Sequence, residues 1–360
     1  MSGQLSVIHI ASGDRWAGAE VQVYTLLHQL KSQINVAAII LNEGELSAKL
    51  REAGVKTWVV DESKLSAAQQ FIGICKIFRQ FKPDIIHTHR QKENIFGSIA
   101  NVLTLRRPCV RTVHGAPEFK PSGMGKVQST LDKFCGNYLQ KGIIAVSADL
   151  KEKLLKTFPK GRLYVINNGI SPGDVSHDIE QPDFKLNDPE AVHIGIIGRL
   201  DPVKRVDLFI DMAHLLVTTH KDIKWQFHIF GEGKLETEMK MRAQATKAPI
   251  IFHGHRMDIR NCIHGLHAVV MPSDHEGLPM TALESLAIGT RFICHDVGGL
   301  SKLFEKQPEF LVQTHSPEGY AEKVIQAIDG NSTLPGFPEE YTITSTAAET
   351  LGLYNNFFKN

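Results

Sequence analysis

Short apolar runs alternate with amphipathic stretches along nearly all of the 360 residues, and this alternation constrains the fold more than any other feature of the sequence. Most runs are continuously apolar, as expected for parallel strands that are covered on both faces. Strand–helix alternation with right-handed crossovers predicts doubly wound parallel sheets in an α/β fold. The predicted strands lie within residues 5–11, 36–41, 56–61, 83–89, 109–115, 142–147, 163–167, 192–198, 226–231, 249–254, 267–273, 291–296 and 309–313.

The alternation stops between residues 171 and 189, where the chain is rich in Pro, Asp, Gly and Ser. Such a composition indicates a linker. We therefore expect an N-terminal Rossmann-like domain over residues 1–170 and a C-terminal one over residues 190–340. Ligands of open α/β sheets bind outside the carboxyl ends of the strands, so we expect a central cleft lined by those loops. Residues 341–360 predict a final helix that packs back on the N-terminal domain through an aromatic cluster, Tyr354, Phe357 and Phe358.

Composition and charge exclude several classes of protein. The five cysteines include no CxxC pair, which argues against a zinc ribbon or a disulfide framework. No apolar run approaches the ~20 residues that span a bilayer, and the N-terminal residues do not resemble a signal peptide, so we expect a cytoplasmic protein. Residues 1–165 carry a net charge of +10 and the remainder −9. Either the first half faces an anionic partner, or each half simply has its own solvated surface.

Two carboxylates follow one of the predicted strands. The segment SDHEGLPMTALE at residues 273–284 leaves that strand and enters a helix, with Glu276 just before the helix and Glu284 inside it. The backbone N–H groups of Gly277 and Leu278, with the helix dipole, favour an anion. A carboxylate accepts hydrogen bonds from two sugar hydroxyls at once. We therefore expect a site for a hydroxyl-rich anionic ligand; the alternative is a helix-dipole carboxylate and a solvated glutamate.

Basic and small residues follow other predicted strands. Arg199 and Lys204 follow the first strand of the second domain and suit phosphate oxygens, Arg through its planar fork and Lys as a point charge. Gly18 follows the first strand of the chain and lets backbone approach a ligand. His114 ends a further strand and is expected at the cleft edge. Taken singly, each of these residues is more often structural.

In this order, the motifs resemble those of the family 4 retaining glycosyltransferases of the kind that builds bacterial surface polysaccharides. The resemblance covers nearly the whole chain: AGAE at 17–20, HTH at 87–89, VHG at 113–115, AVS at 145–147, NGI at 168–170, GRL…K at 198–204, FGEG at 230–233, EGLP…E at 276–284 and VGG at 297–299. It implies the GT-B fold, two Rossmann-like domains that face a central cleft. It also implies transfer of a hexosyl or N-acetylhexosaminyl group, with retention, from a nucleoside diphosphate sugar to an acceptor hydroxyl in lipopolysaccharide, capsule or other glycoconjugate synthesis.

The resemblance assigns a role to each matching residue. Glu276 matches the glutamate near the reacting carbon of the donor sugar, and Glu284 the one that holds the ribose. Arg199 and Lys204 match the pair that neutralises the pyrophosphate. The other matches are His114 beside the donor sugar, Gly18 near the phosphates, the backbone from Gly254 to Arg256 at the base, and Gly277 and Leu278 around the sugar phosphate. The implied catalytic set is thus Glu276, His114, Arg199 and Lys204.

Three positions depart from the family pattern. Ala17 replaces the first glycine of a Gly-Gly loop, Ser171 replaces the aspartate of Asn-Gly-x-Asp, and Lys302 replaces the glutamate of Gly-Gly-x-x-Glu. None belongs to the catalytic set, so we expect an active enzyme. Two alternatives stay open: an inactive sugar-nucleotide-binding subunit of a polysaccharide complex, which would not hydrolyse donor, and a GT-B-fold epimerase, which would act without an acceptor.

The sequence predicts that neither a metal nor a cofactor is needed. No two aspartates stand two positions apart, as the metal-binding Asp-x-Asp of other glycosyltransferases requires. The pairs His87/His89 and His253/His255 offer no third ligand nearby in the sequence, so we do not assign them to a metal. No G-x-G-x-x-G occurs, which excludes a dinucleotide fingerprint. A UDP-sugar is the favoured donor and a GDP-sugar the alternative.

The expected partners are a nucleotide-sugar donor and an acceptor glycan, which may be free or lipid-linked, and no nucleic acid. A peripheral contact with the anionic inner face of the cytoplasmic membrane is a further hypothesis. It rests on Arg106, Arg107, Lys120, Lys126 and Lys133. These surround a predicted helix with apolar residues Val127, Leu131, Phe134 and Tyr138 at helical spacing, for which we expect core packing, with membrane contact as the alternative.

Overall fold

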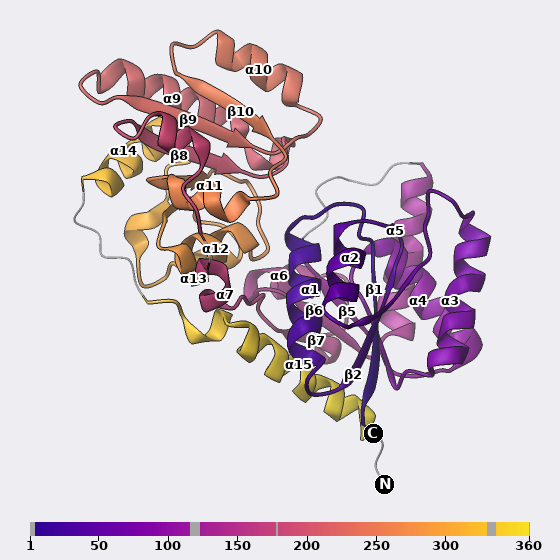
Figure 1. Cartoon of the computed structure of the whole chain (residues 1–360). Coiled ribbons are helices and arrows are strands. Elements are labelled where there is room, and N and C mark those ends of the chain that lie inside the picture. The colour runs from indigo at the N-terminus through magenta and orange to yellow at the C-terminus, as the bar shows by residue number, and fades with distance from the viewer. Residues whose placement is uncertain (1–3, 116–122, 178, 330–335, 360) are drawn as a thin grey trace. The chain divides into compact units, whose positions relative to one another are not determined.

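The computed structural model describes residues 4–115, 123–177, 179–329 and 336–359 (Figure 1). The chain forms two compact units, one of residues 1–170 with 339–360 and the other of residues 171–338. Every predicted strand segment contains a strand. Lys120 lies outside the described residues.

The first unit is a seven-stranded parallel sheet in the order β3-β2-β1-β4-β5-β6-β7, covered by helices on both faces. Alternate side chains of each strand enter different cores: Val7 packs with α1 and α2, whereas Ile8 packs with α3 and α4. A buried Leu or Ile side chain contributes about 1.5–3 kcal/mol, which explains the unbroken apolar runs. The elements are β1 Ser6–Ala11, α1 Gly18–Leu30, β2 Asn35–Ile40, α2 Glu45–Glu52, β3 Lys56–Val59, α3 Ala67–Phe81, β4 Ile85–Thr88, α4 Gln91–Thr104, β5 Cys109–Val113, α5 Met124–Phe134, β6 Gly142–Ala145, α6 Ala148–Leu154, β7 Leu163–Val165 and α15 Ile343–Phe358.

The second unit holds a six-stranded parallel sheet in the order β10-β9-β8-β11-β12-β13. Its main core lies between this sheet and helices α9, α10 and α14. The elements are α7 Pro172–Ser176, α8 Asp183–Asn187, β8 Val192–Ile197, α9 Val206–Thr219, β9 Trp225–Phe230, α10 Glu236–Gln244, β10 Ile250–Gly254, α11 Ile259–Gly265, β11 Ala268–Met271, α12 Met280–Ile288, β12 Arg291–His295, α13 Gly299–Leu303, β13 Leu311–Val312 and α14 Pro317–Ile328.

Residues 171–189, expected as a linker, belong to the second unit and contain α7 and α8. Pro172 stands at the start of α7, where its missing N–H costs no hydrogen bond, and Val175 is buried. The ring of Phe184 in α8 packs on His228, with the ring centroids 4.2 Å apart. The turn-rich composition therefore encodes two short packed helices rather than an open connection.

Helix α15 returns to the first unit and lies against α1. Its entry is held by a parallel bridge between Ile170 and Thr342, and the Ile343 N–H donates to the Ile170 carbonyl at 2.7 Å. A Cβ at Gly169 would lie 2.3 Å from Oγ1 of Thr346, so only glycine fits there. Of the aromatic cluster, Tyr354 is fully buried and Phe357 partly buried, but Phe358 is 44% exposed, contrary to expectation, because it lies in the last turn of the helix.

The apolar stripe of α5 is exposed, which corrects the expectation that it packs in the core. Val127 is 69% exposed and Phe134 49%, while Tyr138, in the π-helical turn that continues α5, is 71% exposed. Leu131, also on this stripe, is 36% exposed. Lys126 and Lys133 are exposed on the same helix. Within the described residues, no helix is long and apolar enough to cross a membrane.

Candidate functional site

In the second unit, the loops after β8 and β11 bring Lys204 and Glu276 together. The Lys204 ammonium lies 2.6 Å from Oε1 of Glu276, and both side chains are largely buried. The backbone holds these loops in register, because the Asp274 N–H donates to the Val203 carbonyl at 2.9 Å. The Arg199 side chain is half exposed and pairs with Asp201 at 2.8 Å. The two predicted phosphate-binding cations thus lie in one loop at the carboxyl end of β8, where Lys204 meets Glu276.

The Val-Gly-Gly motif fixes the loop that carries Glu276. Gly298 has a φ of +60°, and a Cβ there would lie 2.0 Å from the Glu276 carbonyl oxygen. The Gly299 N–H donates to the Gly277 carbonyl at 2.6 Å. Gly277 and Leu278 are buried in this loop. Glycine at position 298 is therefore required for the close approach that places Glu276.

Helix α12 begins after Pro279, which is its N-cap, and carries Glu284 one turn further along. The Glu284 carboxylate is 8% exposed, and Arg260 of α11 donates to it at 3.3 Å. Burial raises the pKa of Glu284, and Arg260 opposes that rise. A buried carboxylate with one partner retains acceptor capacity for hydroxyl groups.

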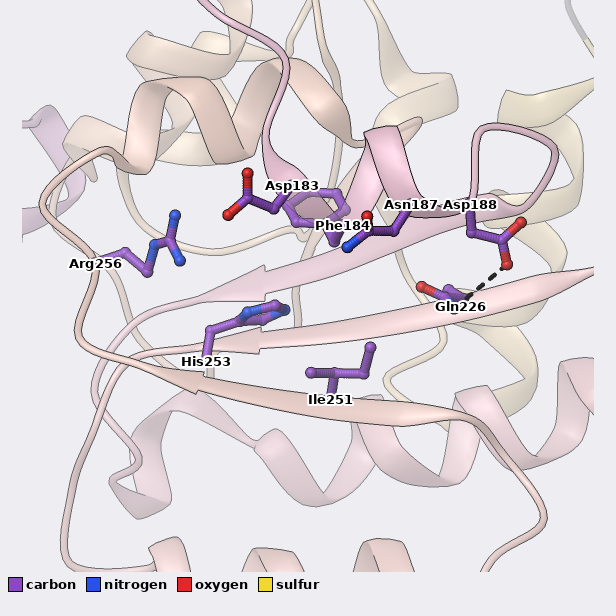
Figure 2. Close-up of a pocket in the computed structure, with 8 residues that line it drawn as sticks. All are labelled: Asp183, Phe184, Asn187, Asp188, Gln226, Ile251, His253 and Arg256. Atoms are coloured by element: carbon purple, nitrogen blue, oxygen red, sulfur yellow. Dashed lines mark hydrogen bonds between the residues drawn. The ribbon is translucent and has the colours of Figure 1, made fainter.

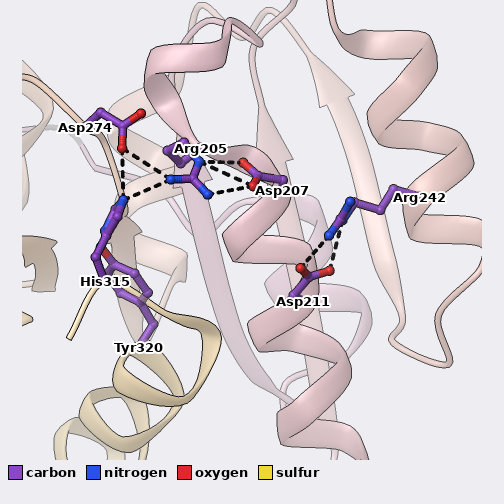
Figure 3. Close-up of polar contacts among 7 residues, drawn as sticks. All are labelled: Arg205, Asp207, Asp211, Arg242, Asp274, His315 and Tyr320. Carbon is purple, nitrogen blue, oxygen red and sulfur yellow. Dashed lines mark hydrogen bonds and ion pairs between the residues drawn. The ribbon is translucent and has the colours of Figure 1, made fainter.

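A cluster of polar side chains that no motif of the sequence predicts anchors Asp274, two positions before Glu276 (Figure 3). Asp274 accepts a hydrogen bond from Arg205 at 3.3 Å and lies 3.0 Å from Nε2 of His315. Arg205 also forms a two-pronged pair with Asp207. His315 in turn contacts the Tyr320 hydroxyl at 2.8 Å. The signal in the sequence is weak, since Arg205 directly follows the matched GRL…K segment but His315 lies 110 residues away.

The predicted base-binding segment ends β10. Gly254 has a φ of +66°, and its carbonyl accepts from the Gly231 N–H at 2.7 Å. Arg256 forms a two-pronged pair with Asp258, which lowers the pKa of that carboxyl. Arg256 also lines a cavity of about 470 Å³ between α8 and the strands β9 and β10, of which β10 is at the edge of the sheet (Figure 2). The cavity walls are Asp183, Phe184, Asn187, Asp188, Gln226, Ile251, His253 and Arg256.

In the first unit, Gly18 is the exposed first residue of α1, beside an ion-pair cluster. Arg90, which caps α4, lies 2.5 Å from Glu20 and 2.9 Å from Asp14. Glu20 is 2% exposed; burial raises its pKa and Arg90 opposes the rise. The sequence motifs gave no role to Arg90 or Glu20, although Glu20 lies within the AGAE motif.

His114 follows β5, is half-buried and contacts a group of buried histidines. Its Nε2 lies 3.1 Å from Nδ1 of His89, while its buried Nδ1 has no partner among the described residues. Burial lowers the pKa of His114 to about 4, so the ring is neutral at physiological pH. A third histidine, His9 from β1, lies beside His87 and His89, although it is far from them in the sequence. Ligand atoms of the three lie within 4.8 Å of one another. Their ring nitrogens, however, are already within hydrogen-bond distance of side-chain partners.

Solved structures with the same architecture share the fold along nearly the whole chain. Anabaena Alr3699/HepE in complex with UDP and glucose superposes with a TM-score of 0.81 at 16% identity, covering 98% of this chain and 100% of that one. Sucrose-phosphate synthase from Thermosynechococcus elongatus gives 0.78 at 15% identity, covering 99% and 100%. The fold is therefore GT-B, as predicted.

The family follows from the sequence itself. Residues 16–174 match the model of glycosyltransferase family 4, and residues 191–330 that of the glycosyl transferases group 1. The chain therefore belongs to the glycosyltransferase family that these two models describe, group 1 or family 4.

Two curated relatives illustrate its range. The UDP-Gal:alpha-D-GlcNAc-diphosphoundecaprenol alpha-1,3-galactosyltransferase of Escherichia coli is 26% identical over 297 residues, covering 79% of this chain and 76% of that protein. The capsular polysaccharide biosynthesis glycosyltransferase CapM of Staphylococcus aureus is 23% identical over 287 residues, covering 76% and 74%.

Proposed function

We propose that the protein transfers a hexosyl or N-acetylhexosaminyl group from a UDP-sugar to an acceptor hydroxyl with retention of configuration. The observation that carries the proposal is the contact between Lys204 and Glu276 beside the start of α12. An ammonium and a helix N-terminus neutralise the negative charge that develops as a diphosphate leaves. The carboxylate next to them accepts sugar hydroxyls, so donor sugar and diphosphate would be held side by side.

The other residues take the roles that the family resemblance implies. Arg199 would join Lys204 at the pyrophosphate, Glu284 would hold the ribose, and the backbone from Gly254 to Arg256 would contact the base. From the first unit, His114 would face the donor sugar and Gly18 the phosphates. The acceptor oxygen would bond to the anomeric carbon on the face from which the diphosphate departs, with its proton passing to the departing phosphate oxygen. No metal or cofactor enters this scheme.

The acceptor we infer is a glycan in surface-polysaccharide or other glycoconjugate synthesis. Support comes from the names of the relatives, one of which acts on a diphosphoundecaprenol-linked sugar and another in capsule synthesis. We place the protein at the inner face of the cytoplasmic membrane, attached peripherally. This placement is supported by the exposed apolar stripe of α5 and its lysines, because such a helix binds anionic lipid through apolar burial and charge together.

Incubation of the purified protein with a panel of UDP- and GDP-sugars tests the proposal. We expect slow hydrolysis of one donor without acceptor, and a product whose anomeric configuration, read by proton NMR, equals that of the donor. An epimerised nucleotide sugar would instead indicate the epimerase alternative. Binding of a nucleotide sugar without any turnover, with or without undecaprenyl-diphosphate-linked sugar as acceptor, would indicate the inactive binding subunit.

A further inference from the structure

Six buried or half-buried side chains of the first unit form one continuous series of hydrogen-bond contacts. It starts at Thr112 on β5 and passes through β4, α15 and β1 before it reaches His114 after β5. Tyr354 is 267 residues from one of its partners, His87, and 345 residues from the other, His9. The contacts, in order, are Thr112 Oγ1 to His87 Nε2 at 2.8 Å, His87 Nδ1 to the Tyr354 hydroxyl at 2.5 Å, Tyr354 to His9 Nε2 at 3.1 Å, His9 Nδ1 to His89 Nε2 at 2.9 Å, and His89 Nδ1 to His114 Nε2 at 3.1 Å.

The number of protons in this series restricts the direction in which its hydrogen bonds can run, from donor to acceptor. Four neutral imidazoles, one threonine and one tyrosine bring six protons to five contacts, so one proton is left over at an end or at Tyr354. If Thr112 donates first, every inner contact is made and the spare proton lies on Nδ1 of His114. If the direction is reversed, the spare proton is the buried Thr112 hydroxyl, which has no other partner among the described residues. If Tyr354 accepts from both sides, its own fully buried hydroxyl proton has no acceptor.

Burial decides between these arrangements. A donor buried without a partner costs about 1–3 kcal/mol. Nδ1 of His114 is buried too and has no partner among the described residues, but it lies at the carboxyl edge of the sheet, where ligands of such folds bind, so a ligand oxygen can accept its spare proton. Thr112 within β5 is 8% exposed and Tyr354 within α15 is fully buried, so a spare proton on either would have no acceptor at the ligand edge. Neutral rings are supported by the pKa values, since burial lowers those of His9, His87 and His89 well below the usual value.

We propose that Thr112, His87, Tyr354, His9 and His89 are positioning residues that fix His114 as the tautomer with hydrogen on Nδ1, so that it donates to an oxygen of the bound donor sugar. The inference rests on the proposed function for the identity of the ligand, but not for the tautomer. The three clustered histidines are thereby assigned to a proton-ordered series rather than to a metal, because their nitrogens are already paired with one another or with hydroxyls.

A series of histidines in the second unit provides an internal control, because its rings carry the opposite tautomer. Nε2 of His193 lies 2.8 Å from the Asp188 carbonyl, which can only accept. His193 must therefore carry hydrogen on Nε2, and its Nδ1 accepts from Nε2 of His228 at 2.9 Å. Nδ1 of His228 in turn accepts from Nε2 of His253 at 2.9 Å. All three rings of this series thus carry hydrogen on Nε2.

Nitrogen-15 NMR of the full chain labelled at histidine tests the tautomers directly, without any activity. We expect His9, His87, His89 and His114 to carry hydrogen on Nδ1, and His193, His228 and His253 on Nε2, with single-histidine variants used for assignment. Hydrogen on Nε2 of His114 would overturn the proposal. So would a stoichiometric transition metal bound to His9, His87 and His89 in the purified protein.

Two substitutions of His89 test the consequence for binding. His89→Phe removes the donor to His114, so affinity for UDP-glucose should fall about tenfold while affinity for UDP stays unchanged. His89→Gln should restore binding, because its amide accepts from His9 and donates to His114. Equal weakening of UDP and UDP-glucose, or no rescue by Gln in a folded variant, would contradict the positioning role. If the wild-type protein binds neither ligand, the proposed donor is wrong, whereas the tautomer measurement still decides the inference.

Discussion

The ammonium of Lys204 lies 2.6 Å from Oε1 of Glu276, although 72 residues separate the two in the chain. Each charge therefore neutralises the other before any substrate arrives. A diphosphate that binds Lys204 must compete with this carboxylate, whereas a sugar hydroxyl that binds Glu276 need not. If the donor binds as proposed, its binding is thus linked to the release of a preformed ion pair.

Glu276→Gln should separate binding from turnover. The neutral amide keeps the shape but frees Lys204, so affinity for UDP should be retained or increased, measured by calorimetry. Turnover at saturating donor should fall at least about a hundredfold, because the charge beside the reacting carbon is lost. Glu305→Gln removes a carboxylate from the exposed pair with Lys302 and should leave both quantities unchanged. A loss of UDP affinity equal to the loss of turnover would count against these roles.

Glu284→Ala should weaken UDP binding and should change the free energy of unfolding little. Loss of charge-assisted hydrogen bonds to two ribose hydroxyls costs about 2–3 kcal/mol. Arg260→Ala is the matched control, because it removes the partner of Glu284 and leaves the carboxylate. Wild-type affinity for UDP in Glu284→Ala would refute the ribose assignment.

Activity should survive excess EDTA. In the proposed scheme, Lys204, Arg199 and the start of α12 would supply the positive charge at the diphosphate, so no divalent ion would be required. The measurement is the initial rate after prolonged treatment with chelator, compared with the untreated protein. Activity that disappears and returns only with added Mg²⁺ or Mn²⁺ would show this prediction to be wrong.

Glu93 should make the protein less stable as the pH rises. Its side chain in α4 is 1% exposed, and burial raises its pKa to about 7. Between the usual value of 4.5 and about 7, the folded protein keeps a proton that the unfolded chain has released, so stability falls through this window and then levels off. Glu93→Gln should therefore gain up to about 3 kcal/mol at about pH 8 relative to wild type, and much less at about pH 4.5.

The difference between wild type and Glu93→Gln is the quantity to measure, from urea unfolding at both pH values. The buried histidines have lowered pKa values and destabilise both proteins as the pH falls, so their contribution cancels in the difference. A difference that does not change with pH would contradict the account of Glu93.

Vesicle binding should depend on both lipid charge and the stripe of α5. Co-sedimentation is expected with vesicles containing phosphatidylglycerol at low salt and should decrease at high salt, because surface charges are screened beyond ~8–10 Å. Val127→Asp should abolish it, whereas Ile72→Asp, at a 53% exposed apolar position of α3, should not. Equal binding to neutral phosphatidylcholine vesicles, or none at low salt, would favour a soluble acceptor.

Local patterning predicted the elements of both sheets, because a strand covered on both faces must be apolar throughout. The same patterning misjudged the stripe of α5: helical spacing shows that Val127 and Phe134 share a face, but not whether another element covers that face. It also predicted a linker over residues 171–189, since the partly buried Phe184 packs on rings far along the chain, such as His228 and His253.

The candidate site, like the fold, could be predicted from the sequence only in part. Motifs placed Glu276, Lys204 and Glu284 at strand ends and at a helix start, where the structure has them. The anchors of these loops, such as His315 beside Asp274, depend on contacts across 41 residues or more and have no local signal. The meeting of His9 with His87 and His89 likewise requires the order of the strands, with β1 next to β4, which spacing along the chain does not contain.

The return of α15 to the first unit has a consequence for biosynthesis. Residues 171–338 form an uninterrupted unit, but the unit before it needs Ile343, Leu353 and Tyr354 from beyond it to complete its core. As the chain leaves the ribosome, the second domain is the one that can finish folding first, reversing the usual order. Until α15 emerges, His9 and His87 lack Tyr354, and the face of α1 that α15 covers is open to chaperones and to premature association.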